Sequence, residues 1–233
     1  MQSNTKIETT TVIHSKKPEP AEELSRTEAA YVMLKEALIT LQIKPGEYLN
    51  TAQLMERFEL GRTPILHALH RLSTEGLIQI IPRKGAMAAP LSLDDAMDLI
   101  EVRLVNEELC VRLAAARVTD VELAELSAIA QAFEQHANQR DLIALMTTDR
   151  LFHEKLTDVA RSSSLRDILS VLHARSQRFW ALSFLTEGHA EDVAQEHHQV
   201  VAALAERDSD KAAAAIRQHV NSFRNSLLVR NAH

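Results

Sequence analysis

From Ser92 onward the sequence repeats apolar residues at helical spacing and is interrupted only by short polar breaks. Helices are expected over six segments, at approximately 93–117, 119–138, 141–160, 164–184, 189–206 and 208–229. Short connections join antiparallel neighbours, so this part is predicted to form an all-α antiparallel bundle of roughly six to seven helices. The composition also favours helices over sheets, because only five residues are glycine and 4% are aromatic.

Before Ser92 the chain is punctuated by proline and glycine at short intervals, and three helices are expected there. The first starts at Ser25, which has capping-box spacing to Glu28, and stops before residues 44–46. The second follows Asn50, a residue type that caps helix N-termini well. Each helix is therefore bounded by a local signal.

A third helix is expected from the turn at Gly61 to Gly76, followed by a small β-hairpin that turns at residues 82–85. Helix, helix, short turn, helix and hairpin is the layout of a winged helix-turn-helix. The chain is thus predicted to be mainly α. Its parts are a disordered leader (1–24), a winged helix-turn-helix DNA-binding domain (25–91) and a helical effector- and metal-binding domain (92–233).

Charge is distributed unevenly between the two parts. The net charge is −6, but residues 1–90 carry 11 Lys and Arg against 10 Asp and Glu. A local basic surface suffices for phosphate contact even on an acidic protein. No apolar run approaches the roughly 18 residues that span a bilayer, and no signal-peptide stretch is present. Cys110 has no second cysteine to pair with. We therefore expect a cytoplasmic protein with no membrane partner.

In a helix-turn-helix the second helix enters the major groove with its N-terminal residues facing base edges. Arg62 stands at that end, placed for a bidentate contact with guanine or for a grip on phosphate, and Thr63 can bond a phosphate there. The predicted DNA-binding residues are Arg62, Thr63, Pro64, His67, His70, Arg71, Arg83, Lys84 and Gly85, with double-stranded operator DNA as the partner. The alternative is a small helical subdomain with a solvated basic face.

A metal site is expected inside the bundle. Asp149 and His153 are four residues apart and share one helix face. His197 and His219 are equidistant from the turn at residue 208, and such residues lie side by side in an antiparallel hairpin. Three imidazoles and a carboxylate suit a divalent ion, with zinc first and nickel, manganese or iron as alternatives. The competing interpretation is that these spacings arise by chance, because the chain has 11 histidines. Five further histidines are interpreted as ordinary hydrogen-bonded residues: His136, His173, His189, His198 and His233.

Several ordered motifs lie between residues 28 and 90. They are residues 34–38, 44–49, Leu54, residues 61–65, Ala68, Leu69, Leu72, residues 75–77 and, in the hairpin, Lys84 and Gly85. This series closely resembles the DNA-binding domain of the GntR family. The family usually has serine at the position of Gly61 and an Arg-Glu pair where Leu66 and His67 stand. Arg62 is retained, and Leu66 can contact a thymine methyl group instead.

The second half resembles the FCD ligand-sensing domain of the FadR subfamily over about residues 93–225. The matching segments are residues 101–103, Glu107, residues 113–117, 149–153, Glu196, His197, Val200, Ala203, Leu204, Asp208 and residues 217–220. The resemblance implies that Asp149, His153, His197 and His219 bind a metal. It also implies that Arg103 faces the effector cavity, although an ion pair with Glu107 is the alternative. Asn106 replaces a usual apolar residue and is expected to add a polar group to the cavity.

The resemblance implies a homodimeric, ligand-responsive repressor in which a small organic acid alters operator affinity. Two other functions are weighed. Three histidines and an aspartate can activate a metal-bound water, as in a metal-dependent hydrolase. A metal-stabilised bundle can also serve protein association. Neither explains the N-terminal winged segment, so the chain is expected not to be an enzyme.

Overall fold

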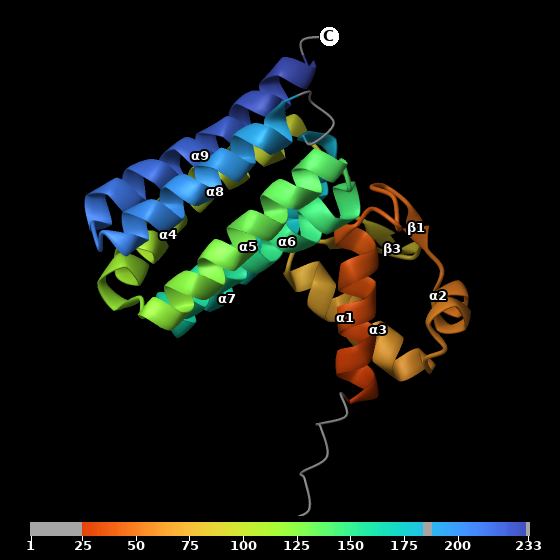
Figure 1. Ribbon diagram of the computed structural model, residues 1–233. Coiled ribbons are helices and arrows are strands. Elements are labelled where there is room, and N and C mark those ends of the chain that lie inside the picture. The colour runs from red at the N-terminus through yellow and green to blue at the C-terminus, as the bar shows by residue number, and fades with distance from the viewer. Residues whose placement is uncertain (1–24, 184–187, 232–233) are drawn as a thin grey trace, which may run out of the picture.

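The computed structural model describes residues 25–183 and 188–231, and the predicted leader, residues 1–24, lies outside this part. Within these residues the chain forms nine helices and three short strands. Figure 1 shows the first three helices and the strands gathered beside a bundle made by the other six. The predicted fold, mainly α with an N-terminal winged helix-turn-helix and a C-terminal bundle, is confirmed. No helix of the described part is long and apolar enough to cross a membrane.

The first helices begin where capping residues satisfy backbone N–H groups that have no partner within the helix. α1 (Arg26–Ile39) follows Ser25, whose hydroxyl accepts a hydrogen bond from the N–H of Glu28. α2 (Thr51–Phe58) follows Asn50, whose side chain accepts from the N–H groups at the helix start. α3 (Arg62–Thr74) follows Gly61. The core that unites these helices includes Leu34, Leu38, Ile65, Leu69 and Leu72.

The strands form a three-stranded antiparallel sheet, one strand more than the predicted hairpin. β2 (Ile78–Ile81) and β3 (Gly85–Ala88) make the hairpin, and β1 (Tyr48–Leu49) pairs with the other side of β3. Two residues are too few for an alternating pattern to reveal a strand in the sequence. Tertiary contacts hold β1 instead, because the N–H of Ala88 donates to the carbonyl of Glu47 and Leu49 is buried.

The six helices of the bundle begin and end within two residues of the predicted segments. They are α4 (Leu93–Arg117), α5 (Asp120–Gln139), α6 (Leu142–Val159), α7 (Ser163–Ser183), α8 (His189–Ala205) and α9 (Ser209–Asn231). Local signals explain this agreement. Thr119 and Glu122 form a capping box at the start of α5, and the Asp141 side chain caps α6.

α7 connects the bundle to the N-terminal domain. Ala174 lies in the apolar core of the N-terminal domain. The guanidinium of Arg175 lies over Gly76, and the buried guanidinium of Arg178 donates to the carbonyl of Ala89. One bundle helix therefore carries contacts that reach the N-terminal domain.

Candidate metal centre and nucleic-acid interface

Asp149, His153, His197 and His219 converge in the middle of the bundle. α6 contributes Asp149 and His153, α8 contributes His197 and α9 contributes His219. All four are buried, and one donor atom from each lies within 4.8 Å of the others. The structure thus brings together the four residues that the sequence singles out.

Two of the imidazoles lie against carboxylates. Nδ1 of His219 is hydrogen-bonded to Oε2 of Glu196 at 3.0 Å, and Nδ1 of His153 lies 3.0 Å from Oε2 of Glu107 without the geometry of a hydrogen bond. A histidine that gives its Nδ1 proton to a carboxylate presents the lone pair of Nε2 to a metal. The two Nε2 atoms are only 3.2 Å apart, so both rings aim at the same point.

His197 is held by aromatic rings rather than by a carboxylate. Its ring stacks on Phe152, with centroids 4.0 Å apart, and meets Phe133 edge-on at 4.8 Å. Nε2 of His197 lies 3.3 Å from Oδ1 of Asp149. Neither of these two atoms has a hydrogen-bond partner among the described residues, although both are buried. Buried polar atoms left unpaired are costly, so this arrangement fits two atoms that ligate an ion.

The protonation states also fit a divalent ion. Burial lowers the pKa of His197 and of His219 to about 3, and that of His153 to about 4. The imidazoles are therefore neutral near pH 7, which is the form that ligates metals. Burial raises the pKa of Asp149 to about 6, and a cation beside it would favour the ionised carboxylate. Three nitrogen donors and one carboxylate suit zinc, nickel, manganese or iron.

Glu107 links this cluster to Arg103. Nε and Nη2 of Arg103 lie 2.7 Å and 2.5 Å from Oε1 of Glu107, and Nε2 of His173 lies 3.1 Å from the same oxygen. Burial alone would raise the pKa of Glu107, but the charge of Arg103, with smaller contributions from the histidines, lowers it well below the usual range. Glu107, His153 and His173 also form a cluster with metal-ligand spacing. The guanidinium on the same carboxylate disfavours a second cation there.

A small cavity lies beside Arg103 and two residues of the four-residue cluster. Its volume is about 10 Å³, which is room for about one water molecule. Ser176 and Gln177 of α7 line it together with Asp149 and His153. Nη1 of Arg103, Oγ of Ser176 and Oε1 of Gln177 are buried there without a hydrogen-bond partner in the described part of the chain.

Sequence reasoning missed several residues of this region. The prediction of an ordinary, hydrogen-bonded histidine at His173 agrees with its bond to Glu107, but His173 also lines the cavity. A signal did exist, because His173, Ser176, Gln177 and Trp180 share one helix face through their spacing of three, four and seven residues. The contacts of Glu107 with His153 and of Glu196 with His219 join different helices, so the sequence does not reveal them. Of the other four histidines, His198 pairs with Glu134 near the surface, and His233 lies outside the described residues.

Asn106 is placed differently from its expected role. It lies half-exposed on α4, and its amide donates to the carbonyl of Val102 one turn earlier. It does not line the cavity beside Arg103. For Arg103, the ion pair with Glu107 and the position beside the cavity occur together.

The N-terminal end of α3 offers a face free for DNA. Arg62, Thr63, His67 and His70 are exposed, and Leu66 is 43% exposed between them, while Pro64 is half-buried. Positions 62, 63, 66, 67 and 70 share one side of the helix, opposite the buried Ile65 and Leu69. Such a polar helix face with an N-terminal arginine matches the shape and chemistry of a major groove.

Arg71 is engaged within its own domain. Its Nη1 lies 2.9 Å from Oε2 of Glu28, its Nε lies 3.6 Å from Oε1 of Glu75, and its guanidinium stacks 3.4 Å from the ring centroid of Tyr31. Two carboxylates thus neutralise a side chain that the sequence places on the DNA-binding face.

The wing presents its basic residues at the hairpin tip. Arg83, Lys84 and Gly85 are exposed in the turn between β2 and β3. Arg83 has a φ of 65° and Gly85 a φ of 99°. The turn is closed by a hydrogen bond from the N–H of Lys84 to the carbonyl of Ile81. Proline before a residue with positive φ is the pattern of a type II turn, and both cations are exposed in it.

Comparisons with known proteins agree with this geometry. Residues 26–87 match the family described as bacterial regulatory proteins, gntR family, and residues 98–222 match the FCD domain. The Nta operon transcriptional regulator of Aminobacter aminovorans is 27% identical over 82% of this chain and 89% of its own length. The transcriptional repressor RspR of Escherichia coli K12 is 26% identical over 84% of this chain and 86% of its own. The solved structure of E. coli McbR/YncC has the same fold, with a TM-score of 0.81 at 20% identity over 91% of this chain and all of that one.

Proposed function

The chain belongs to the GntR family of bacterial regulatory proteins with an FCD domain, and we propose that a metal-bound small organic acid controls this transcriptional regulator. Its relatives are transcriptional regulators and not enzymes. We propose that it acts in the cytoplasm as a repressor, like the relative that carries that name, and that the acid releases it from operator DNA.

The observation that carries the proposal is the group of buried, unpaired polar atoms between Arg103 and the candidate metal ligands. A ligand carboxylate would satisfy Nη1 of Arg103 and Oγ of Ser176 by accepting their hydrogen bonds. Nε2 of each of the three histidines and Oδ1 of Asp149 would hold the ion, which would supply a coordination position for an oxygen of the acid. Glu107 and Glu196 would keep the imidazoles of His153 and His219 in the ligating tautomer.

The size of the cavity suggests how binding reaches the DNA-binding domain. A cavity of about 10 Å³ admits an organic acid only when lining side chains move. Ser176 and Gln177 line it from α7, and Ala174 and Arg178 of the same helix contact the N-terminal domain. Movement of α7 would shift the recognition helices relative to the bundle, and ligand affinity would differ between the two positions.

A homodimer would place two recognition helices on a two-fold symmetric operator. α4 offers a surface for this assembly, because Val102, Val105 and Leu109 are 44%, 70% and 49% exposed at a spacing of three and four residues. Exposed apolar residues that form a contiguous patch mark protein–protein interaction sites. We propose a second copy of the chain as its partner.

The test is fluorescence anisotropy with DNA from upstream of the protein's own gene and with a scrambled duplex of equal length. We expect the zinc-loaded protein to prefer the native duplex by about 10³-fold or more, with affinity falling steeply as salt rises. A panel of small carboxylic acids should weaken that binding and change the emission of Trp180, which lines the cavity. Equal binding to both duplexes contradicts operator recognition. Zinc binding without any response to acids would favour a metal-stabilised interaction bundle.

The coupling through α7 gives a second prediction. Arg178→Met removes the hydrogen bond to Ala89 while retaining most of the apolar stem. Effector coupling typically changes affinity by about 5- to 150-fold. We expect the acid-dependent change in operator affinity to fall to about twofold in this variant, while zinc affinity measured by chelator competition stays the same.

Arg166→Met is the matched control, because Arg166 lies on the same helix but is exposed and pairs with Asp158. It should respond to the acid like the unmodified protein. A full acid response in Arg178→Met would refute the role of this contact, and an equal loss in both variants would point to a general effect on α7.

A further inference from the structure

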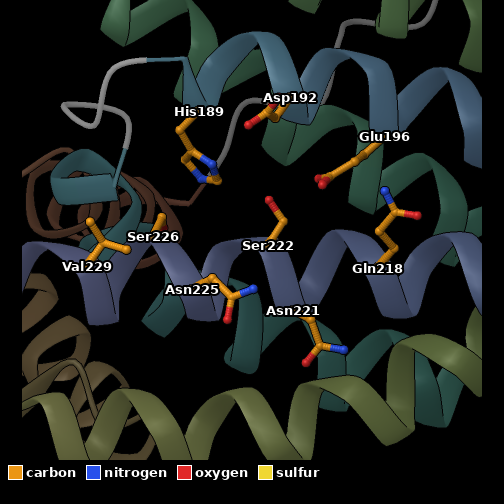
Figure 2. Close-up of a pocket in the computed structure, with 9 residues that line it drawn as sticks. All are labelled: His189, Asp192, Glu196, Gln218, Asn221, Ser222, Asn225, Ser226 and Val229. Carbon is orange, nitrogen blue, oxygen red and sulfur yellow. The ribbon is translucent and has the colours of Figure 1, made fainter.

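A second hollow, separate from the cavity beside Arg103, lies between α8 and α9. It has a volume of about 440 Å³ and is open to solvent. Figure 2 shows His189, Asp192 and Glu196 extending from α8 towards α9, where Ser222 and Gln218 extend towards them. His189 and Glu196 are buried, so the floor of this hollow is polar and partly removed from water.

The hollow continues along the helix pair. A neighbouring hollow of about 270 Å³ shares Asp192, Glu196 and Gln218 with the first and adds Gln195 and Gln199. Together they form one groove, here called the α8–α9 groove. Its α8 side runs from residue 189 to residue 199, which is about 15 Å of helix.

The chemistry of the groove is that of a receptor for cations. Asp192 and Glu196 lie one turn apart near its middle, and none of the described residues that line it is lysine or arginine. Among the described residues that line it, Val229 is the apolar one, and the others offer carboxylate, amide, imidazole or hydroxyl groups. Glu196 already accepts a hydrogen bond from His219, and Asp192 is exposed. Carboxylates with no lysine or arginine beside them among the described lining residues attract a cation that can also donate hydrogen bonds.

A single metal ion does not fit this layout. Among the described residues, the groups whose donor atoms all lie within 4.8 Å of one another are the two at the centre of the bundle. His189, Asp192 and Glu196 do not form such a group, so their donor atoms are spread too widely for one ion. An elongated ligand with separated positive charges suits them better.

We propose that the α8–α9 groove binds an aliphatic diamine or polyamine through its ammonium groups. Carboxylates at positions i and i+4 of a helix start from Cβ atoms about 5–6 Å apart. Ammonium groups separated by three or four methylenes have a similar spacing, and each donates three hydrogen bonds. Amide and hydroxyl oxygens such as those of Gln218 and Ser222 would accept the remaining protons.

Binding of an amine in the groove would affect the candidate metal ligands at the centre of the bundle. Oε2 of Glu196 lies 3.0 Å from Nδ1 of His219, whose Nε2 faces Nε2 of His153. An ammonium on Glu196 would compete for the carboxylate that orients this ring. This second readout rests on the proposed metal site, whereas binding of the amine itself does not.

The experiment is isothermal titration of spermidine into the full-length protein, free of DNA and dialysed against chelator. Asp192→Asn keeps the size of an exposed side chain and removes one charge, so we expect about tenfold weaker binding. Glu191→Gln, the adjacent exposed acid outside the groove, is the matched control and should bind as before. This control is needed because the chain carries a net charge of −6, which attracts any polyamine weakly.

Four outcomes overturn the proposal of an amine site. Absence of heat would mean that spermidine does not bind, and an equal loss in both variants would mean that spermidine meets only the general negative charge. Equal competition by magnesium would identify a divalent-ion site, and equal competition by glycerol would identify a site for polyols. Zinc affinity that stays constant with spermidine bound would refute only the link to His219.

Discussion

Replacement of His197 by alanine is expected to abolish most of the stabilisation that zinc gives to this protein. Structural zinc sites gain about 10–16 kcal/mol from four ligands, so one ligand contributes roughly 3 kcal/mol, or about a hundredfold in affinity. At a zinc concentration of about 100 times the Kd, the unmodified protein gains about 2.7 kcal/mol. The variant would gain only about 0.4 kcal/mol at the same concentration. Urea unfolding with and without zinc measures both gains.

The adjacent residue supplies a matched control. His198 follows His197 on α8, but its side chain is 38% exposed and pairs with Glu134, whereas His197 is fully buried against Asp149. His198→Ala should keep the full zinc effect. Asp149→Asn, which preserves volume, should lose it and guards against a folding defect in His197→Ala. Equal zinc stabilisation in all four proteins would eliminate the proposed metal site.

Replacement of Arg62 by alanine is expected to have the largest effect on DNA binding. A bidentate contact to a base contributes about 1–3 kcal/mol of discrimination. In a dimer on two half-sites the loss doubles to about 2–6 kcal/mol, or roughly 30-fold to 10⁴-fold in operator affinity. Anisotropy titrations against operator and scrambled duplexes at several salt concentrations measure this loss.

Arg62→Lys separates the two roles that the sequence leaves open. If Arg62 reads guanine, the Arg62→Lys variant should lose most of its operator specificity, because lysine lacks the planar guanidinium that makes a bidentate contact. Its affinity should still depend on salt concentration. If Arg62 grips phosphate, lysine should restore most of the affinity.

Arg71→Ala is the comparison variant, because Arg71 is held by Glu28, Glu75 and Tyr31. This variant should lower the free energy of unfolding by roughly 1 kcal/mol or less. Its operator affinity should stay within a few fold of the unmodified value. Equal losses of operator affinity in Arg62→Ala and Arg71→Ala would place the DNA on a different face of α3.

The order and bounds of the helices could be predicted from the sequence because the signals that set them are local. Asn50 and Asp141 begin α2 and α6 by bonding N–H groups two or three residues later. The convergence of His197 and His219 could also be predicted from the sequence. A short turn makes two helices antiparallel, and residues at equal distances from the turn then lie side by side. Such inferences need only neighbours along the chain and one regular geometry.

The ion pair of Arg103 with Glu107 could be expected from their spacing, but tertiary structure decided the other partners of the buried charges. The carboxylate of Glu107 contacts Arg103, one turn away on the same helix, and also His153 of α6 and His173 of α7. The two-residue strand β1, the engagement of Arg71 and the outward position of Asn106 were equally hidden. For β1, and for the contacts of Arg71 with Glu28 and Tyr31, the partners come from other elements, whose position is set by packing of the whole core. The sequence by itself determined where the helices lie and which residues can act chemically, whereas helix packing decided which of them meet.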